Sequence, residues 1–323
     1  MKKKFVVEAG GGRLGNQMMQ LMVANTITKD LADFEVCGYQ MPEWRLSRPA
    51  GTFDRRFPVL VWMEAPLGIV AAFCKLGLTN YVFMRSVHLD YSWFPSKGEA
   101  ASLFHPLAED DAKGFDENHI VIHVRAEDAL QGGHPDYGPI PIEYYKSILE
   151  ESGLKPVFLG QLSDDYYSNM LRNAFPDALF VPPSSPIKDF QVMRNSKNIV
   201  ISTSTFGWLA AWLSDAKRIY MPLIGGFNPC QRPDINLTPL EDPRFIYDLF
   251  PVRLWRADPE QIDALQVAHD FRRLTTNEVT QIRERQNRLL TPRRFMKGLQ
   301  LTRYVLRQLA WRAMGLFRIS RKT

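Results

Sequence analysis

The sequence predicts an α/β protein of two domains, the second of Rossmann type, followed by a C-terminal amphipathic helical tail. The chain has 323 residues, more than one compact core usually holds. Its second half alternates short apolar runs with helix-like segments, which is typical of a parallel sheet covered by helices. Near the N-terminus, an apolar run leads into a glycine-rich turn and an apparent helix start.

The N-terminal segment combines a strand, a turn and a helix that could hold an anion. A strand is expected over 5–8 and a helix over 15–33, joined through Gly10-Gly11-Gly12-Arg13-Leu14-Gly15-Asn16-Gln17. Such a turn brings backbone N–H groups and a guanidinium to one point, which suits a phosphate or a sugar hydroxyl. A glycine turn that only reverses the chain is the alternative.

Four apolar runs in the second half predict buried parallel strands, separated by segments with helical character. The expected strands cover 120–125, 156–160, 198–202 and 217–222, and the expected helices cover 141–152, 164–174, 187–195 and 206–214. This repeat indicates a Rossmann-type domain over 116–290, which is preceded by a domain over 1–115 and followed by a tail over 291–323. Residues 40–105 show no clear period, and we expect loops and short helices there.

Composition places the chain among ordinary globular proteins. It is 45% hydrophobic and 23% charged, and it has no uncharged span of 18 residues. The three cysteines, Cys37, Cys74 and Cys230, are far apart and lack CxxC spacing. This number and spacing argue against a disulfide framework or a zinc site and favour a reducing compartment.

Polar side chains follow the ends of two predicted strands. His123 and Arg125 alternate at the end of the first, where an arginine can clamp a diphosphate; a local ion pair with Glu127 or Asp128 is the alternative. Ser202-Thr203-Ser204-Thr205 opens the helix after the third strand, where hydroxyls, N–H groups and the helix dipole favour an anion.

The turn after the second strand carries neighbouring acids. There Ser163 or Asp164 is expected to cap the next helix. Neighbouring carboxylates without a spaced partner make a poor metal cage, so no metal is expected.

Several motifs together resemble the inverting α-1,2-fucosyltransferases of glycosyltransferase family 11, over about residues 5 to 250. They are Gly12-Arg13-Leu14-Gly15-Asn16-Gln17, His123-Val124-Arg125, Ser163-Asp164-Asp165, Lys188-Asp189-Phe190-x-x-Met193 and Ser204-Thr205-Phe206-Gly207-Trp208. The resemblance implies a GT-B-like enzyme with two Rossmann-type domains that face a cleft, in which residues 1–115 form the acceptor-side domain and residues 116–290 the nucleotide-sugar-binding domain. It would move L-fucose from GDP-L-fucose to a sugar hydroxyl and require no metal or other cofactor. A wider similarity links the chain to α-1,6-fucosyltransferases.

The resemblance also implies roles for single residues. Arg125 would hold the β-phosphate and His123 another part of the donor, while Asp189 would bind the guanine. Ser204, Thr205 and the N–H of Phe206 would hold phosphate oxygens, and Arg13 and Asn16 would line the cleft. The expected donor-binding set is completed by Gly15, Asp164 and Ser202.

The general base that inversion requires has several candidates. Asp128, three residues after Arg125, is the family-like acid. His134 and Asp136, in the loop that follows, are alternatives.

Two departures from the family pattern keep other functions open. Ala126 stands where the family often has a second arginine, and Gly207-Trp208-Leu209 replaces Ser-Trp-Trp. Another nucleotide-sugar donor, an α-1,6 linkage, and a catalytically silent glycan- or membrane-binding protein are therefore alternatives.

The tail, residues 293–322, contains nine Lys or Arg residues and no acid. Positions 295, 299, 302, 306, 309, 313, 316 and 317 share one helical face, and all but one of them are apolar. This pattern predicts a helix on an anionic membrane surface. Together with the reducing compartment that the cysteines favour, it leads us to expect a cytoplasmic enzyme held at the inner face of a membrane, and the lack of an N-terminal membrane anchor leads us to expect a bacterial one. Packing on the protein's own core and nucleic-acid binding are alternatives, and no nucleic-acid partner is expected.

Overall fold

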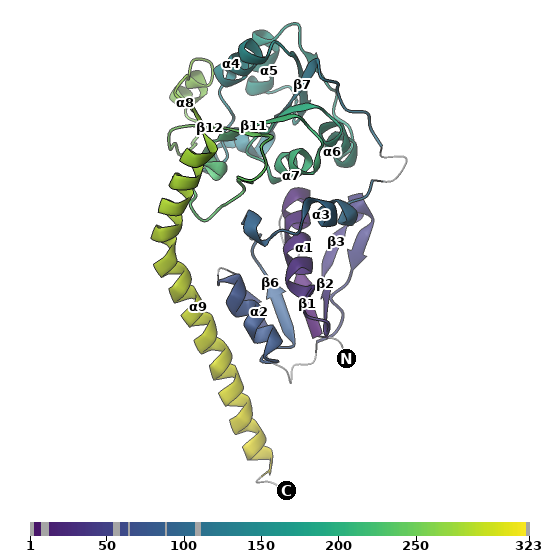
Figure 1. Cartoon of the computed structure of the whole chain (residues 1–323), viewed down its shortest axis with the longest axis vertical. Coiled ribbons are helices and arrows are strands. Elements are labelled where there is room, and N and C mark those ends of the chain that lie inside the picture. The colour runs from purple at the N-terminus through teal and green to yellow at the C-terminus, as the bar shows by residue number, and fades with distance from the viewer. Residues whose placement is uncertain are drawn as a thin grey trace. The chain divides into compact units, whose positions relative to one another are not determined.

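The structure, a computed structural model, describes residues 3–7, 13–53, 59–63, 65–87, 89–106 and 111–320, with side chains up to residue 311. The chain divides into two compact units (Figure 1). Unit 1 contains residues 1–88, 93–95 and 287–323, and unit 2 contains residues 89–92 and 96–286. This division differs from the predicted one, because residues 96–115 group with the second unit and the tail groups with the first.

Unit 1 is built on a four-stranded parallel sheet in the order β2-β1-β6-β5. Its elements are β1 (Lys3–Val7), α1 (Leu14–Thr28), β2 (Phe34–Cys37), β3 (Tyr39–Met41), η1 (Pro42–Trp44), β4 (Leu46–Arg48), β5 (Val59–Trp62), α2 (Leu67–Lys75) and β6 (Tyr81–Met84). Strands β3 and β4 form a separate antiparallel pair. The strand order reverses between β1 and β6, which marks the position where an open parallel sheet offers a crevice at its carboxyl ends.

The interpretation of residues 40–105 as loops and short helices was wrong for part of that region. It contains β5 and β6 of the parallel sheet, and α2 between them. Each of these strands is only four residues long, too short to show a period of its own. Their assignment depends on pairing with distant strands.

Unit 2 is built on a seven-stranded sheet in the order β13-β12-β11-β10-β7-β8-β9. Its elements are α3 (Lys97–Leu103), β7 (His119–Val124), η4 (Glu127–Gln131), α4 (Ile142–Ser152), β8 (Lys155–Gly160), α5 (Tyr166–Ala174), β9 (Leu179–Phe180), α6 (Pro186–Arg194), β10 (Asn198–Val200), α7 (Thr205–Leu213), β11 (Arg218–Leu223), η5 (Gly225–Phe227), β12 (Phe245–Leu249), α8 (Pro259–Ala264) and β13 (Arg272–Leu274). All neighbouring strands are parallel except β12 and β13. The four predicted strands and four predicted helices are confirmed, and each unit has the predicted α/β architecture.

The sheet of unit 2 has its topological switch point between β7 and β10. From β7 the chain proceeds to β8 and β9 on one side, and from β10 to β11 and β12 on the other. Helices that follow β7 and β10 therefore cover opposite faces, and a crevice opens outside the carboxyl ends of these two strands. The predicted polar residues follow these two strands.

Apolar side chains bury the centre of this sheet. Ile120, Val121 and Ile122 of β7 are completely buried, as expected for a strand covered on both faces. On α7, Trp208 and Trp212 stack with their ring centres 5.5 Å apart. The indole N–H of Trp208 donates to the carbonyl of Leu237 at 2.7 Å, so the helix is held in one orientation.

The longest helix, α9 (Thr276–Ser320), contains the predicted tail helix and begins well before it. Its residues up to 286 belong to unit 2, where buried Arg283 donates from NH1 to the carbonyl of Ile235. Its residues from 287 onward belong to unit 1. Among the described helices, we find none with an apolar stretch long enough to cross a membrane.

A buried polar network in unit 2 predicts a large effect of one substitution. Asp248 is fully buried and accepts from the Tyr144 hydroxyl at 3.0 Å and from Arg273 Nε at 3.0 Å. Asp248→Ala leaves the Tyr144 hydroxyl without its acceptor and Arg273 with Glu151 as its carboxylate partner, and it is expected to reduce the free energy of unfolding by about 3–5 kcal/mol in urea denaturation. Asp270→Ala, which breaks the exposed pair with Arg253, is the control and is expected to cost about 1 kcal/mol or less. Equal losses would contradict this.

Candidate active site

The residues after β7 and β10 meet at the switch point of unit 2. The Nδ1 atom of His123 lies 2.6 Å from the hydroxyl oxygen of Ser202. Arg125 donates from NH1 to the carbonyl of Thr203 at 2.9 Å. Two hydrogen bonds thus connect the side chains at the end of β7 with the residues that follow β10. This confirms that the polar residues of the two strands lie together.

The Arg125 guanidinium is held on three sides. Besides Thr203, it donates from NH2 to Asp128 at 3.2 Å, and its carbon lies 4.5 Å from the ring centre of Tyr137. Its side chain is 17% exposed, and its Nε is buried without a hydrogen-bond partner among the described residues. Since a buried N–H without an acceptor is costly, this atom is a candidate contact for an acceptor atom of a ligand. The ion pair with Asp128, expected as the alternative, coexists with this arrangement.

The imidazole of His123 is neutral near pH 7. The ring is buried, and burial, with a smaller effect from the Arg125 charge, lowers its pKa to about 4. An ideal Cβ at Gly207 would lie 2.7 Å from Nδ1 of this ring. Helix α7 can approach the ring so closely only because residue 207 is glycine.

The start of α7 directs a helix N-terminus to the switch point. Ser204 is the N-cap and its hydroxyl accepts from the Gly207 N–H, while Thr205 and Phe206 form the first turn. The N–H groups of a first turn and the helix dipole favour an anion in front of them. The Ser204 hydroxyl accepts from Gly207 and the Ser202 hydroxyl bonds His123, so each keeps further hydrogen-bonding capacity. The predicted phosphate contacts of Ser204 and Thr205 stay predictions.

The three candidate bases have different surroundings. The side chain of Asp128 is 49% exposed and lies beside Arg125. His134 Nδ1 accepts from the Asp136 N–H at 3.2 Å, which places the proton of a neutral ring on Nε2. Asp136 is buried and accepts from Arg232 at 2.9 Å and from Gln231. Of the three, Asp128 is the one bonded to Arg125, while Asp136 is held by Gln231 and Arg232.

The outer predicted residues lie further along the carboxyl edge. The prediction that Ser163 or Asp164 caps α5 was wrong: Asp165 is the cap and accepts from the Ser168 N–H at 2.8 Å. Asp164 is exposed and accepts from Asn169. Asp189 is half-buried on α6, and burial raises the pKa of its carboxyl.

The remaining predicted residues belong to unit 1. Arg13 immediately precedes α1, while Gly15 and Asn16 lie in its first turn, and α1 follows β1 beside the reversal of strand order in that sheet. Gly10, Gly11 and Gly12 lie outside the described residues. The predicted convergence of this segment with Arg125 in a common cleft stays a prediction.

The turn after β7 contains features that the sequence analysis did not predict. Gln161 accepts from the Ala126 N–H at 3.0 Å and donates to Glu127 at 2.6 Å. Glu127 has a φ of 51°, an uncommon conformation for a residue other than glycine. Such strain persists where surrounding contacts fix it, and it occurs often at functional sites.

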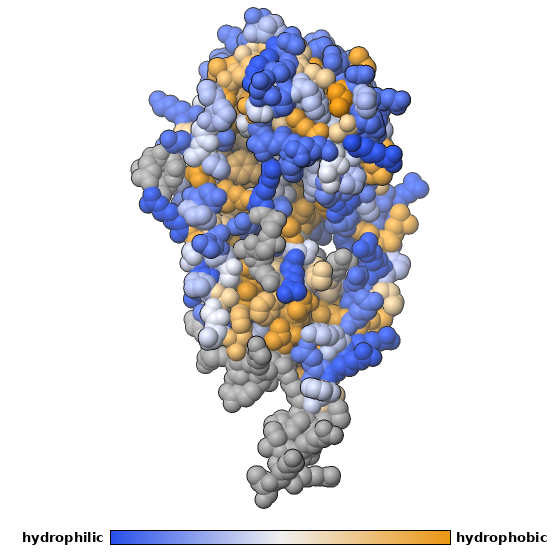
Figure 2. Space-filling view, turned by 180° about the vertical axis from the view of Figure 1, so that it is seen from behind, coloured by the Kyte–Doolittle hydropathy of each residue, from blue (hydrophilic) through white to orange (hydrophobic). Residues whose placement is uncertain are grey.

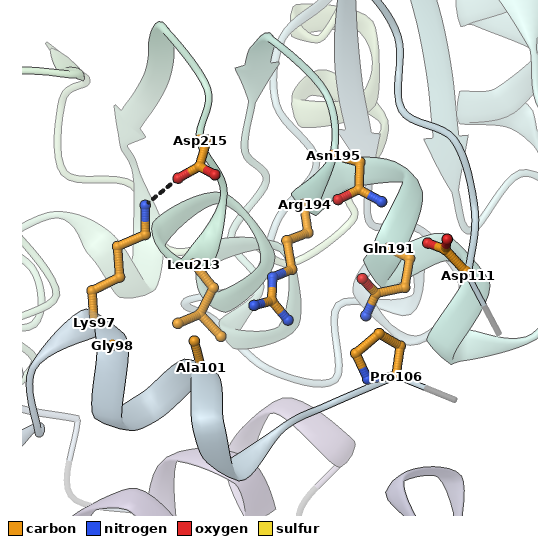
Figure 3. A pocket seen from close by; sticks show the side chains of 10 residues that line it. All are labelled: Lys97, Gly98, Ala101, Pro106, Asp111, Gln191, Arg194, Asn195, Leu213 and Asp215. Carbon is orange, nitrogen blue, oxygen red and sulfur yellow. Dashed lines mark hydrogen bonds and ion pairs between the residues drawn. The ribbon is translucent and has the colours of Figure 1, made fainter. Parts of the chain in front are cut away.

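A separate pocket of about 500 Å³ lies elsewhere in unit 2 (Figure 3). Its lining comes from α3, α6 and the end of α7, and includes the ion pair of Lys97 with Asp215 and the half-buried Arg194. Because α7 runs back from the carboxyl edge of the sheet, its end lies toward the opposite edge. None of the predicted site residues lines this pocket. Among the described residues, no group of three or more His, Cys, Asp or Glu side chains could hold a metal ion.

Comparisons with known proteins agree with the motif pattern. Residues 163–225, from the turn after β8 to the end of β11, match the model of glycosyl transferase family 11. The chain therefore resembles that family, as predicted, over the segment that contains β10 and the start of α7. A comparison with curated protein sequences found no match.

Solved structures of glycosyltransferases show a distant likeness. An α-1,6-fucosyltransferase NodZ, soaked with GDP-fucose, has a TM-score of 0.40 at 14% identity and covers 68% of this chain and 94% of its own. Fucosyltransferase NodZ from Bradyrhizobium has a TM-score of 0.40 at 15% identity, covering 68% and 95%. The E. coli heptosyltransferase WaaC with ADP has a TM-score of 0.36 at 13% identity, covering 89% and 98%.

The buried neutral His123 predicts a specific pH dependence of stability. Its folded pKa of about 4 lies below the ordinary 6.5, so between these values the unfolded chain binds the proton and the folded protein does not. The stabilisation is complete above pH 6.5 and is lost as the pH falls toward 4. When the pH falls from 7 to 4.5, the free energy of unfolding measured in urea should decrease by roughly 2–3 kcal/mol more in wild type than in His123→Asn. The same loss in both proteins would exclude a buried neutral ring.

Proposed function

We propose that the protein is an inverting fucosyltransferase that moves L-fucose from GDP-L-fucose to a sugar hydroxyl, in an α-1,2 linkage, without a metal ion. The observation that carries the proposal is the buried Arg125 at the switch point, with an unpartnered Nε beside the N-terminus of α7. The match of residues 163–225 to glycosyl transferase family 11 supports it, because that segment supplies one side of the arrangement.

The reaction needs positive charge where the diphosphate departs. As the bond from fucose to the β-phosphate oxygen breaks, negative charge grows on GDP, and fixed donors in a dry site stabilise it. Arg125 supplies a charge whose direction is set by Thr203 and Tyr137. The first turn of α7 supplies N–H groups, and His123 supplies a neutral hydrogen-bonding group rather than a second charge.

Inversion also needs a group that receives the proton of the acceptor hydroxyl. We assign this role to Asp128, whose half-exposed carboxyl is bonded to the donor-binding Arg125. The acceptor oxygen attacks the anomeric carbon of fucose from the face opposite the departing GDP, and its proton passes to the carboxylate. The acceptor is a lipid-linked or surface-polysaccharide precursor at the cytoplasmic face of a bacterial membrane.

Calorimetric titration of GDP and GDP-L-fucose into the full chain, with EDTA present, tests the donor site. Wild type is expected to bind both. Arg125→Ala is expected to weaken binding by about 2 kcal/mol, the scale of a lost charged hydrogen bond. Arg125→Lys keeps the charge but loses the Nε–H and the fork, so it should restore only part of the affinity.

Arg253→Ala is the matched control, because that arginine forms an exposed pair with Asp270 in the same unit. Its affinity should equal that of wild type. Failure of folded wild type to bind either nucleotide would overturn the proposal. Preference for a different nucleoside diphosphate would overturn the choice of donor.

Substitution of the assigned base should affect turnover more than binding. Asp128→Asn keeps an oxygen that can accept from Arg125 but removes the basic carboxylate, so kcat is expected to fall by about 10²–10⁴-fold with little change in donor affinity. Transfer of labelled fucose to a range of sugar acceptors measures this, with Asp270→Asn, at an exposed carboxylate paired with Arg253, as control. If His134→Gln abolished transfer while Asp128→Asn did not, the assignment would be wrong.

A further inference from the structure

Two contacts fix which side of α9 packs on unit 1. At Gly298, an ideal Cβ would lie 2.4 Å from Ile69 Cδ1, so glycine lets α9 lie directly on α2. Ten residues later, the Gln308 amide donates to the Val59 carbonyl at 3.2 Å and accepts from the Val59 N–H at 3.5 Å. This side chain pairs with β5, the edge strand of the sheet. The helix is therefore held at two points on one side.

The residues between these contacts confirm the packed side. Leu301 is 8% exposed and Val305 is 2% exposed, and both share the face of Gly298 and Gln308 at helical spacing. Neither residue belongs to the apolar stripe that the sequence predicted. That stripe is displaced from the packed face, so part of it is left uncovered.

The outward side carries large apolar side chains. Phe295 and Leu306 of the predicted stripe are 63% and 56% exposed, and Met296 and Trp311 are 50% and 79% exposed. Singly exposed apolar residues are normal on a soluble protein, and Figure 2 shows them interspersed with hydrophilic residues on one face of the molecule. On α9, by contrast, several lie along one helix within about four turns.

The charge on the same segment has one sign. Residues 287–311 contain six basic side chains and no acid: Arg288, Arg293, Arg294, Lys297, Arg303 and Arg307. Arg303 and Arg307 are exposed beside Met296, on the side opposite Gly298. A surface that combines exposed aromatic and aliphatic groups with arginines is complementary to an anionic interface.

We propose that the outward side of α9, formed by Phe295, Met296, Arg303, Leu306, Arg307 and Trp311, binds the surface of an anionic bilayer. The apolar side chains enter the headgroup region while the arginine stems extend along it with their charges in water. A second copy of the chain would bring two like-charged faces together, which charge repulsion disfavours. The proposal does not depend on the assigned transfer reaction.

Sedimentation of the full chain with vesicles tests this surface. Binding is expected to vesicles of 70% phosphatidylcholine and 30% phosphatidylglycerol, and to be at least about tenfold weaker to phosphatidylcholine alone, because each arginine gains from the anionic surface. Arg303→Gln/Arg307→Gln should reduce binding to the anionic vesicles about tenfold or more. Leu306→Ser/Trp311→Ser should do the same, since it removes the inserted groups.

Leu76→Ser/Val267→Ser is the matched control. It also replaces two exposed apolar side chains, which are 71% and 70% exposed, but neither of them lies on α9. It should bind vesicles like wild type, and all variants should keep the far-UV circular dichroism spectrum and the thermal unfolding midpoint of wild type. Vesicle binding that does not depend on anionic lipid, or that the α9 variants leave unchanged, would overturn the proposal. The proposal would also be overturned if the α9 variants lost self-association or nucleic-acid binding and kept vesicle binding.

Discussion

The close approach of α7 to β7 is the constraint on which the candidate site depends. Gly207 leaves room for the His123 ring, the ring bonds Ser202, and the end of β10 then presents the Thr203 carbonyl to Arg125. Since β7 and β10 are neighbours at the switch point, these contacts connect the two halves of the sheet. A side chain at residue 207 would displace the ring or the helix, and with either the orientation of Arg125.

This constraint explains physically how the chain departs from the family pattern at residues 126 and 207. Residue 207 is glycine where the family often has serine, and a Cβ at this position would collide with the His123 ring of this chain. Ala126, where the family often has a second arginine, is fully buried, and its N–H is held by Gln161. In the turn after β7 the positive charge is therefore that of Arg125, whose direction is fixed by Thr203, Asp128 and Tyr137.

Local pattern predicted four of the seven strands of unit 2, namely β7, β8, β10 and β11, and the helices α4 to α7, because apolar runs and capped helices are properties of neighbouring residues. It did not predict β9, β12 or β13. It brought His123, Arg125 and Ser202 to one edge, since the carboxyl ends of parallel strands must meet there. It missed β5 and β6, which are four residues long, and the ring of Tyr137 beneath Arg125. It also placed the apolar stripe of the tail off the packed face, because that face is set by Ile69 and Val59. Long-range partners leave no local period in a sequence.

The most direct test of the central claim is a crystal structure of the full chain with GDP, grown with EDTA. The account predicts that the β-phosphate lies within hydrogen-bond distance of Arg125 Nε and in front of the first turn of α7, with His123 still bonded to Ser202. GDP bound elsewhere, or a diphosphate that leaves Arg125 Nε without an acceptor, would contradict it.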